Sequence, residues 1–210
     1  MRRIPLIAAC TVGVLIAGIA VVRLLPGPND PSVTPAATVS PAAASDVPLP
    51  DAAARVTKKT FGLAVSPGNS PVSPERFTGL HTGVDFELFP GEDPHRMAVR
   101  ALCDGTILVA RHATGYGGVI VQSCSLEQRP VTVIYGHVWI ESARVAVGSA
   151  VKRGDTLAVL GAAYSTETDG ERAHLHLGIH RGAAVDIRGY VASQQQLAAW
   201  IDPLTVIPAF

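Results

Sequence analysis

The sequence predicts a mainly β fold, with antiparallel strands in a sheet or barrel-sandwich-like arrangement and few short helices. Short apolar runs recur along the second half of the chain, polar or Gly-containing breaks separate them, and only one segment has a helical pattern. Closely spaced short strands with turn signals between them are typical of antiparallel sheets, sandwiches and barrels. The expected strands are residues 97–102, 106–111, 119–122, 131–138, 144–147, 156–160, 174–180 and 185–190.

Residues 1–25 are predicted to be a membrane-targeting segment. After the basic pair Arg2 and Arg3, residues 4–22 are apolar or small at all but two positions. As a helix this run spans roughly 28 Å, which nearly matches a hydrocarbon core of about 30 Å. The basic flank predicts a cytoplasmic N-terminus, with the rest of the chain on the other side of the membrane. The segment is either an uncleaved transmembrane anchor or a cleaved signal peptide.

Residues 26–55 are predicted to be a linker, and residues 56–210 the folded domain. The linker is dominated by Pro, Ala, Ser and Asp and has no hydrophobic period, so it cannot bury enough apolar surface to fold. A Pro-rich chain of this length reaches roughly 80 to 90 Å at most. Within the domain, residues 193–200 are predicted to be helical, with Ser193 as the cap and a proline just beyond the end.

The composition excludes one class of partner. Lys and Arg together number 17, as do Asp and Glu, so the formal net charge is zero. A nucleic-acid-binding domain needs a basic surplus, so we expect no nucleic-acid partner. Nothing in the sequence indicates an oligomer, and a monomer is the default expectation.

Cys103 and Cys124 form a candidate disulfide. The strand-like segments that flank residues 112–118 predict a hairpin centred near Ala113 and Thr114, which places the two cysteines opposite each other. Directly opposed residues on antiparallel strands have Cα atoms about 4.5 to 5.5 Å apart, a separation that a disulfide can bridge. An exported domain favours the disulfide. Two buried free thiols are the alternative.

The first pattern that carries chemistry is His81-Thr82-Gly83-Val84-Asp85. Imidazole and carboxylate are both good zinc ligands. A spacing of four residues lets both side chains reach one ion, either on a helix face or across a loop that enters a strand, and the glycine favours the loop. Taken alone, the pattern also describes a surface histidine and an ordinary acidic residue.

The second pattern is Ala173-His174-Leu175-His176-Leu177. Residues two apart in a strand share a face, so the two histidines point one way and the two leucines point to the core. Two neighbouring imidazoles suit a metal ligand beside a catalytic group. The polar face of an edge strand is the alternative for this pattern alone.

The third pattern, Tyr135-Gly136-His137, ends an apolar strand, where a lone histidine is more often structural. The combination is more specific. His81-x-x-x-Asp85, Tyr135-x-His137 and His174-x-His176, in this order, resemble the lysostaphin-type (LytM-type) zinc metallopeptidases, which are peptidoglycan endopeptidases. The resemblance spans about residues 60–204, and further matching pieces are Phe61-Gly62, Gly115-Tyr116-Gly117-Gly118, Val147-Gly148 and Trp200-Ile201-Asp202-Pro203.

Carried over residue by residue, this resemblance implies that His81, Asp85 and His176 bind one Zn²⁺. It implies that His137 and His174 assist catalysis without binding the metal, and leaves open which of them is the base. Three protein ligands leave a fourth position for water, as in catalytic zinc sites. Zinc lowers the pKa of bound water towards about 7, and a nearby imidazole can take its proton.

The implied function is zinc-dependent hydrolysis of peptide cross-links in bacterial peptidoglycan. The implied location is the cell envelope, either anchored in the inner membrane through residues 4–22 or secreted if the signal is cleaved. A different class of function is a non-hydrolytic regulatory module of the same type, which binds and activates another cell-wall hydrolase.

Two departures from the family pattern concern the rim of the expected groove. Residues 164–172 are longer and more acidic than the usual Ser-Thr-Gly approach, and Leu177-Gly178 replaces a common Phe-Glu. Both leave open which peptidoglycan bond is cut. An upstream segment that blocks the zinc is a further possibility, with Asn69 and Ser70 as its candidates.

Overall fold

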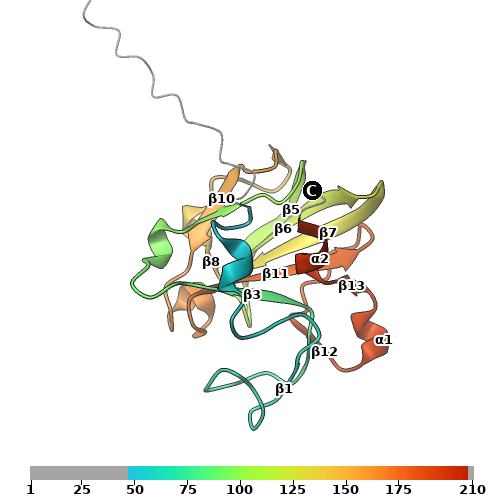
Figure 1. The fold of residues 1–210 in the computed structure, drawn as a ribbon. Coiled ribbons are helices and arrows are strands. Elements are labelled where there is room, and N and C mark those ends of the chain that lie inside the picture. The colour runs from blue at the N-terminus through green and yellow to red at the C-terminus, as the bar shows by residue number, and fades with distance from the viewer. Residues whose placement is uncertain (1–46, 208–210) are drawn as a thin grey trace, which may run out of the picture. The chain divides into compact units, whose positions relative to one another are not determined.

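The computed structural model describes residues 47–207 (Figure 1). The expected membrane segment and residues 26–46 of the expected linker lie outside the described residues. Among the helices of this described part, none has the length and apolar character needed to cross a membrane.

The described chain is built mainly from short strands, as the sequence predicts. The strands are β1 (Ala64–Val65), β2 (Gly79–His81), β3 (Gly83–Glu87), β4 (Ala98–Arg100), β5 (Gly105–Ala113), β6 (Gly117–Leu126), β7 (Arg129–Gly136), β8 (Val138–Trp139), β9 (Ala150–Val151), β10 (Thr156–Leu160), β11 (His174–Arg181), β12 (Tyr190–Val191) and β13 (Trp200–Ile201). The helices are η2 (Ala52–Arg55), η3 (Pro94–Arg96), η4 (Ile140–Ser142), η5 (Thr166–Thr168), α1 (Gln194–Leu197) and α2 (Pro203–Val206).

The strands form one large sheet and two small ones. The large sheet has the order β13-β11-β7-β6-β5-β9, and β3 pairs with β11 beside it. The small sheets have the orders β1-β2-β12 and β4-β10-β8. Every strand pairing is antiparallel, which confirms the predicted class. The barrel-like part of the expectation is not met, because no sheet within the described residues closes on itself.

β11 has the alternation predicted for its histidines. Leu175, Leu177 and Ile179 are fully buried in the main hydrophobic core, whereas His174 and His176 lie on the opposite face. Burying such aliphatic side chains contributes roughly 1.5 to 3 kcal/mol each. The core therefore fixes the direction in which the histidines point.

Two expected strands are absent or largely absent, and five strands were not predicted: β1, β2, β3, β9 and β13. Residues 144–147 form no strand, because the chain turns there: Ser149 N donates to Ala146 O at 3.0 Å and Val147 is 63% exposed. Of residues 185–190 only the last is in a strand. The glycine of the His81–Asp85 pattern predicted a loop that enters a strand, whereas β2 and β3 are strands separated only by Thr82. Residues 83–87 are buried throughout.

The folded part begins earlier than residue 56. Val47 and Leu49 are buried, and Arg55 is 2% exposed. Arg55 forms a bidentate ion pair with Glu92 at 2.6 and 2.9 Å and lies over the Phe89 ring. The linker boundary predicted at residue 55 is therefore corrected, because these few apolar and charged residues find partners on the domain.

The helix predicted at 193–200 is present but shorter. α1 spans Gln194–Leu197, and the Ser193 hydroxyl accepts from Gln196 N at 3.3 Å, which confirms Ser193 as its cap. Strand β13 follows directly. Asp202 then caps a second short helix, α2, by accepting from Leu204 N at 3.0 Å.

The structure joins Cys103 and Cys124 by a disulfide, with Cα atoms 6.0 Å apart. The hairpin register differs from the one predicted. β5 and β6 turn around Gly115, and a β-bulge between Ile107 and Val109 shifts their pairing. Cys103 consequently lies before β5 rather than directly opposite Cys124, yet close enough for the bond.

Candidate metal centre

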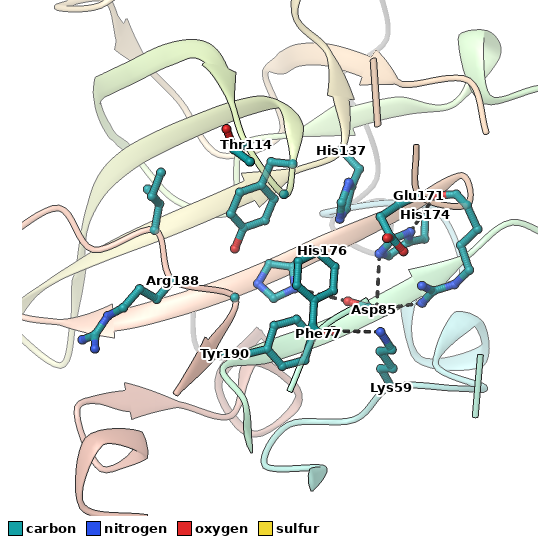
Figure 2. Close-up of a pocket in the computed structure, with 15 residues that line it drawn as sticks. Lys59, Phe77, Asp85, Thr114, His137, Glu171, His174, His176, Arg188 and Tyr190 are labelled. Carbon is teal, nitrogen blue, oxygen red and sulfur yellow. Dashed lines mark hydrogen bonds and ion pairs between the residues drawn. The ribbon is translucent and has the colours of Figure 1, made fainter. Parts of the chain in front are cut away.

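The paired strands β3 and β11 position the centre (Figure 2). Their antiparallel register places His176 opposite Asp85 and His174 opposite Glu87, so these four side chains share one face. Gly83 allows β3 to pass close to His176 on β11. A β carbon at this residue would lie 2.8 Å from His176 Cε1 and overlap the Leu177 carbonyl, so only glycine lets β3 pass this closely.

Three potential ligand atoms meet at one point. His81 Nε2 lies 3.0 Å from His176 Nδ1 and 3.1 Å from Asp85 Oδ1, and the last two atoms are 3.2 Å apart. The three residues are at most 3% exposed. Zinc bound tetrahedrally at about 2.0 to 2.1 Å separates its ligand atoms by roughly 3.3 Å. The donor set and its spacing therefore fit a zinc ion, with two imidazoles and one carboxylate.

Hydrogen bonds hold the outer atoms of two of these side chains, His81 and Asp85. His81 Nδ1 donates to Thr60 O at 3.1 Å, which directs Nε2 at the other two ligand atoms. Asp85 Oδ2 accepts from Arg172 at 2.7 Å and lies 3.3 Å from His174 Nε2. Both ends of the candidate ligand set are thus oriented by neighbours.

His137 and His174 lie beside this triangle. Their ring centroids are 4.2 Å apart, and His174 Nδ1 donates to Arg172 O at 2.8 Å. His137 has φ +62°, in the left-handed region, at the junction between β7 and β8. Such a conformation costs about 1 to 3 kcal/mol in a residue other than glycine. His137 is held in this strained conformation with its ring facing the centre (Figure 2).

Gly136 leaves room for the ring of Tyr116, from the β5–β6 hairpin turn, to pack beside His137. A β carbon on Gly136 would overlap the Tyr116 ring, which packs 5.4 Å from both the His137 and the His176 rings, centroid to centroid. Tyr116, from the Gly-Tyr-Gly-Gly turn, therefore forms an aromatic wall against the two histidines.

The centre opens into a cavity of about 350 Å³ (Figure 2). The cavity is lined by residues from the three histidine patterns, the hairpin turn, the loop before β11, the segment upstream of β2 and the segment that leads into β12. Its lining residues are Lys59, Phe77, Asp85, Thr114, Gly115, Tyr116, His137, Glu171, Arg172, His174, His176, Ile187, Arg188, Gly189 and Tyr190.

Burial and neighbouring charges set the protonation states in the centre. Burial acts to raise the pKa of Asp85, but the imidazoles of His174 and His81 hold it well below its usual range. Burial lowers the pKa of His176 to about 4. Burial also lowers the pKa of His137 well below its usual value, and the charge of His174 adds to this. Neutral pH therefore leaves Asp85 ionised and both imidazoles neutral.

Several residues of the cavity were not predicted from the sequence. Lys59, only 1% exposed, pairs with Glu75 at 2.6 Å and donates to the Tyr190 hydroxyl at 2.8 Å. Phe77 stacks on Tyr190, with centroids 5.1 Å apart. The only sequence signal for these residues is their position: Lys59, Glu75 and Phe77 lie within 25 residues upstream of His81.

The upstream segment lines the cavity through a different residue from those predicted. Asn69 is exposed and its backbone pairs with Ser66, while the Ser70 hydroxyl donates to Glu75 at 2.7 Å. Neither residue lines the cavity, whereas Phe77 does. The segment therefore contributes an aromatic wall to the cavity.

No curated protein matches this chain. Among solved structures, LytU matches with 25% identity and a TM-score of 0.48, over 71% of this chain and 81% of that one. The catalytic domain of the antimicrobial peptidase lysostaphin from Staphylococcus simulans matches with 20% identity and a TM-score of 0.48, over 71% and 90%.

A sequence-family match covers more than half of the chain. The profile described as peptidase family M23 matches residues 79–187, from the start of β2 to the loop before β12. This range contains all three histidine patterns and the hairpin turn between them. The chain belongs to peptidase family M23.

Proposed function

We propose that this chain is a zinc-dependent endopeptidase that hydrolyses peptide cross-links of bacterial peptidoglycan. The observation that carries the proposal is the buried triangle of His81, Asp85 and His176 ligand atoms, 3.0 to 3.2 Å apart, on the wall of a cavity. Membership of a peptidase family supports the reaction class, and the resemblance to lysostaphin-type enzymes supports the substrate class.

In this proposal His81, Asp85 and His176 hold the zinc. A zinc ion held there would supply Lewis-acid chemistry, polarising the scissile carbonyl and lowering the pKa of a bound water. Three protein ligands are typical of catalytic zinc sites, whereas structural sites have four. The surrounding burial limits the water that reaches the reacting groups.

His137 and His174 handle protons in different ways. His137 Nδ1 is buried with no hydrogen-bond partner among the described residues, and its lowered pKa keeps the ring neutral. A neutral imidazole with a free nitrogen accepts a proton, so we assign His137 as the general base. His174 Nδ1 donates to Arg172 O, which orients the ring, and its Nε2 lies 3.3 Å from Asp85 Oδ2. We assign His174 Nε2, beside the metal ligands, as the group that interacts with the developing charge or the leaving amine.

The location follows from the same proposal. We place the domain in the bacterial cell envelope, joined to the inner membrane through residues 4–22 if that segment is not cleaved. Its partner is then the peptide part of peptidoglycan. A non-hydrolytic module that activates another hydrolase is the competing function, and the complete set of five site residues argues against it.

The test measures zinc content and muropeptide release from purified sacculi, for wild type and His176→Ala. We expect one zinc per wild-type chain, soluble muropeptides, and the loss of both in the variant. His174→Ala should retain zinc and lose hydrolysis. His180→Ala is the matched control, because His180 lies on the same face of β11 but packs on Trp200 outside the cavity.

Each outcome separates the two functions. A wild-type chain that binds zinc but releases no muropeptides, alone or with excess substrate, contradicts the enzyme and favours the regulatory module. Loss of zinc in His174→Ala contradicts the division of roles between the two histidines of β11.

A further inference from the structure

The loop before β11 departs from the family pattern and places Arg172 against the metal centre. Arg172 Nη2 donates to Asp85 Oδ2 at 2.7 Å and to Glu87 Oε1 at 2.6 Å. Its Nε lies 3.0 Å from each oxygen of Glu87. The side chains of Arg172 and Glu87 are only 11% and 10% exposed, so this three-residue contact is largely shielded from water.

We propose that Arg172, held in place by Glu87, is a positioning residue that fixes Asp85 for metal binding. This role rests on the proposed function, because it requires Asp85 to be a metal ligand. Asp85 directs Oδ1 to His81 and His176 and Oδ2 to Arg172. A guanidinium on the second oxygen stops the carboxylate from rotating, so Oδ1 stays directed at the metal position.

The strand geometry explains why Arg172 reaches this point. Arg172 lies two residues before β11, and its side chain reaches Asp85 and Glu87 on the face that carries His174 and His176. On the paired strand β3, Asp85 and Glu87 are two residues apart and therefore share this face. The backbone of Arg172 also accepts the His174 Nδ1 hydrogen bond, so one residue orients two functional side chains.

Glu87 balances the positive charge of Arg172. An arginine beside a metal ligand repels a divalent cation, which weakens metal binding. The fork of Arg172 pairs with both oxygens of Glu87, and the two side chains together carry no net charge. The pair therefore supplies a rigid donor to Asp85 without adding a positive charge to the site.

Removing the Arg172 side chain has two opposed consequences, and their balance is measurable. Loss of orientation weakens zinc binding, whereas loss of a positive charge strengthens it. Partners that orient metal ligands typically contribute about 10- to 100-fold in metal affinity. A positioning role therefore predicts weaker binding, and a purely electrostatic role predicts tighter binding.

The experiment measures zinc affinity of the full chain, purified in mild detergent, by competition with a chromophoric chelator. We expect Arg172→Met to bind zinc about 10- to 100-fold more weakly than wild type. The absorption spectrum of the Co²⁺-substituted variant should also change, because the Asp85 ligand is no longer held in one orientation. The zinc affinity of Arg172→Lys should lie between those of wild type and Arg172→Met. A single ammonium group cannot reproduce the paired hydrogen bonds of the guanidinium.

Lys58→Met is the matched control. Lys58 Nζ lies 3.4 Å from Glu87 Oε2 on the exposed side, so this variant removes a positive charge from Glu87 without touching Asp85. Its zinc affinity should equal that of wild type. The double variant Arg172→Met/Glu87→Met removes both buried charges, avoids leaving one unpaired, and should also bind zinc 10- to 100-fold more weakly.

Two results overturn the positioning role. If wild type binds zinc and folded Arg172→Met or the double variant binds it equally or more tightly, Arg172 does not position Asp85. If wild type itself binds no zinc, the proposed function falls together with this role. The wild-type measurement thus distinguishes the two failures.

Discussion

The histidines inside the candidate metal centre and those outside it differ in their carboxylate partners. Outside the cavity, each histidine faces a carboxylate of its own, with nitrogen–oxygen distances of 2.8, 2.8 and 4.0 Å for His95–Glu167, His112–Glu141 and His180–Asp186. Inside, a single carboxylate, Asp85, lies within 3.3 Å of three imidazoles.

This difference shows what separates a metal centre from ordinary ion pairs. An exposed histidine and carboxylate form a pair worth about 0 to 1 kcal/mol, which needs no further ligand. One buried carboxylate cannot balance three protonated rings, so burial keeps imidazoles such as His176 neutral. Neutral rings with lone pairs directed at one point are the arrangement that a cation such as zinc stabilises.

The largest effect expected inside the centre is on hydrolysis by His137→Ala. The variant should retain zinc, because His137 is not part of the ligand triangle, while muropeptide release falls about 100- to 10,000-fold with loss of the general base. Zinc content and initial rates on purified sacculi measure both. His95→Ala, which removes an imidazole outside the cavity, should keep the wild-type rate. A His137→Ala variant as fast as wild type would show that another group is the base.

The next effect concerns acid stability of the metal-free chain. The pKa of His176 is about 4 when folded, against about 6.5 when unfolded, so the unfolded state binds the proton more tightly. Stability is therefore lost as the pH falls from about 6.5 to about 4, by roughly 3 kcal/mol from this residue. Asp85 acts the same way at lower pH: its depressed pKa contributes stability in full above its usual value, and this contribution is lost progressively as the pH falls below that value.

Urea unfolding of chelator-treated protein between pH 7 and pH 4 measures this loss. Excess zinc should restore stability at the upper end of this range, because the metal competes with the proton for the same nitrogen. Equal unfolding free energies across the range would mean that burial does not lower the pKa of His176 below its unfolded value.

The smallest effect on stability is expected from a histidine outside the candidate metal centre. His112→Ala should change the unfolding free energy by about 1 kcal/mol or less, because His112 and Glu141 are both more than half exposed. Zinc affinity and hydrolysis should match wild type. A clear loss of zinc in this variant would break the distinction between the two groups of histidines.

Sequence alone predicted the antiparallel class and the face shared by His174 and His176, because alternation over an apolar strand is a local signal. It did not predict β3, since Gly83 is typical of a loop until the close approach of His176 explains it. The approximate pairing of Cys103 with Cys124 tolerated an error in hairpin register, because a disulfide accepts a range of Cα separations.

Contacts between distant segments were beyond the reach of the sequence pattern. Arg172 was noted only as part of an unusual acidic loop. Its pairing with Glu87, 85 residues away in the sequence, depends on the register between β3 and β11. Lys59 and Glu75 likewise meet because the chain folds back at β1 and β2. No local periodicity encodes such contacts, so the residues that support the site could not be predicted from the sequence.

The shared face of β3 and β11 makes the site sensitive to insertions and deletions as well as to substitutions. One residue added to or removed from β11 between His174 and His176 would turn one of the two side chains into the core and replace it with an aliphatic one. The metal centre can therefore form only after this strand pair has reached its final register. Zinc uptake by a refolding chain would accordingly report the completion of folding, and the proposed cell-wall hydrolase would remain inactive until then.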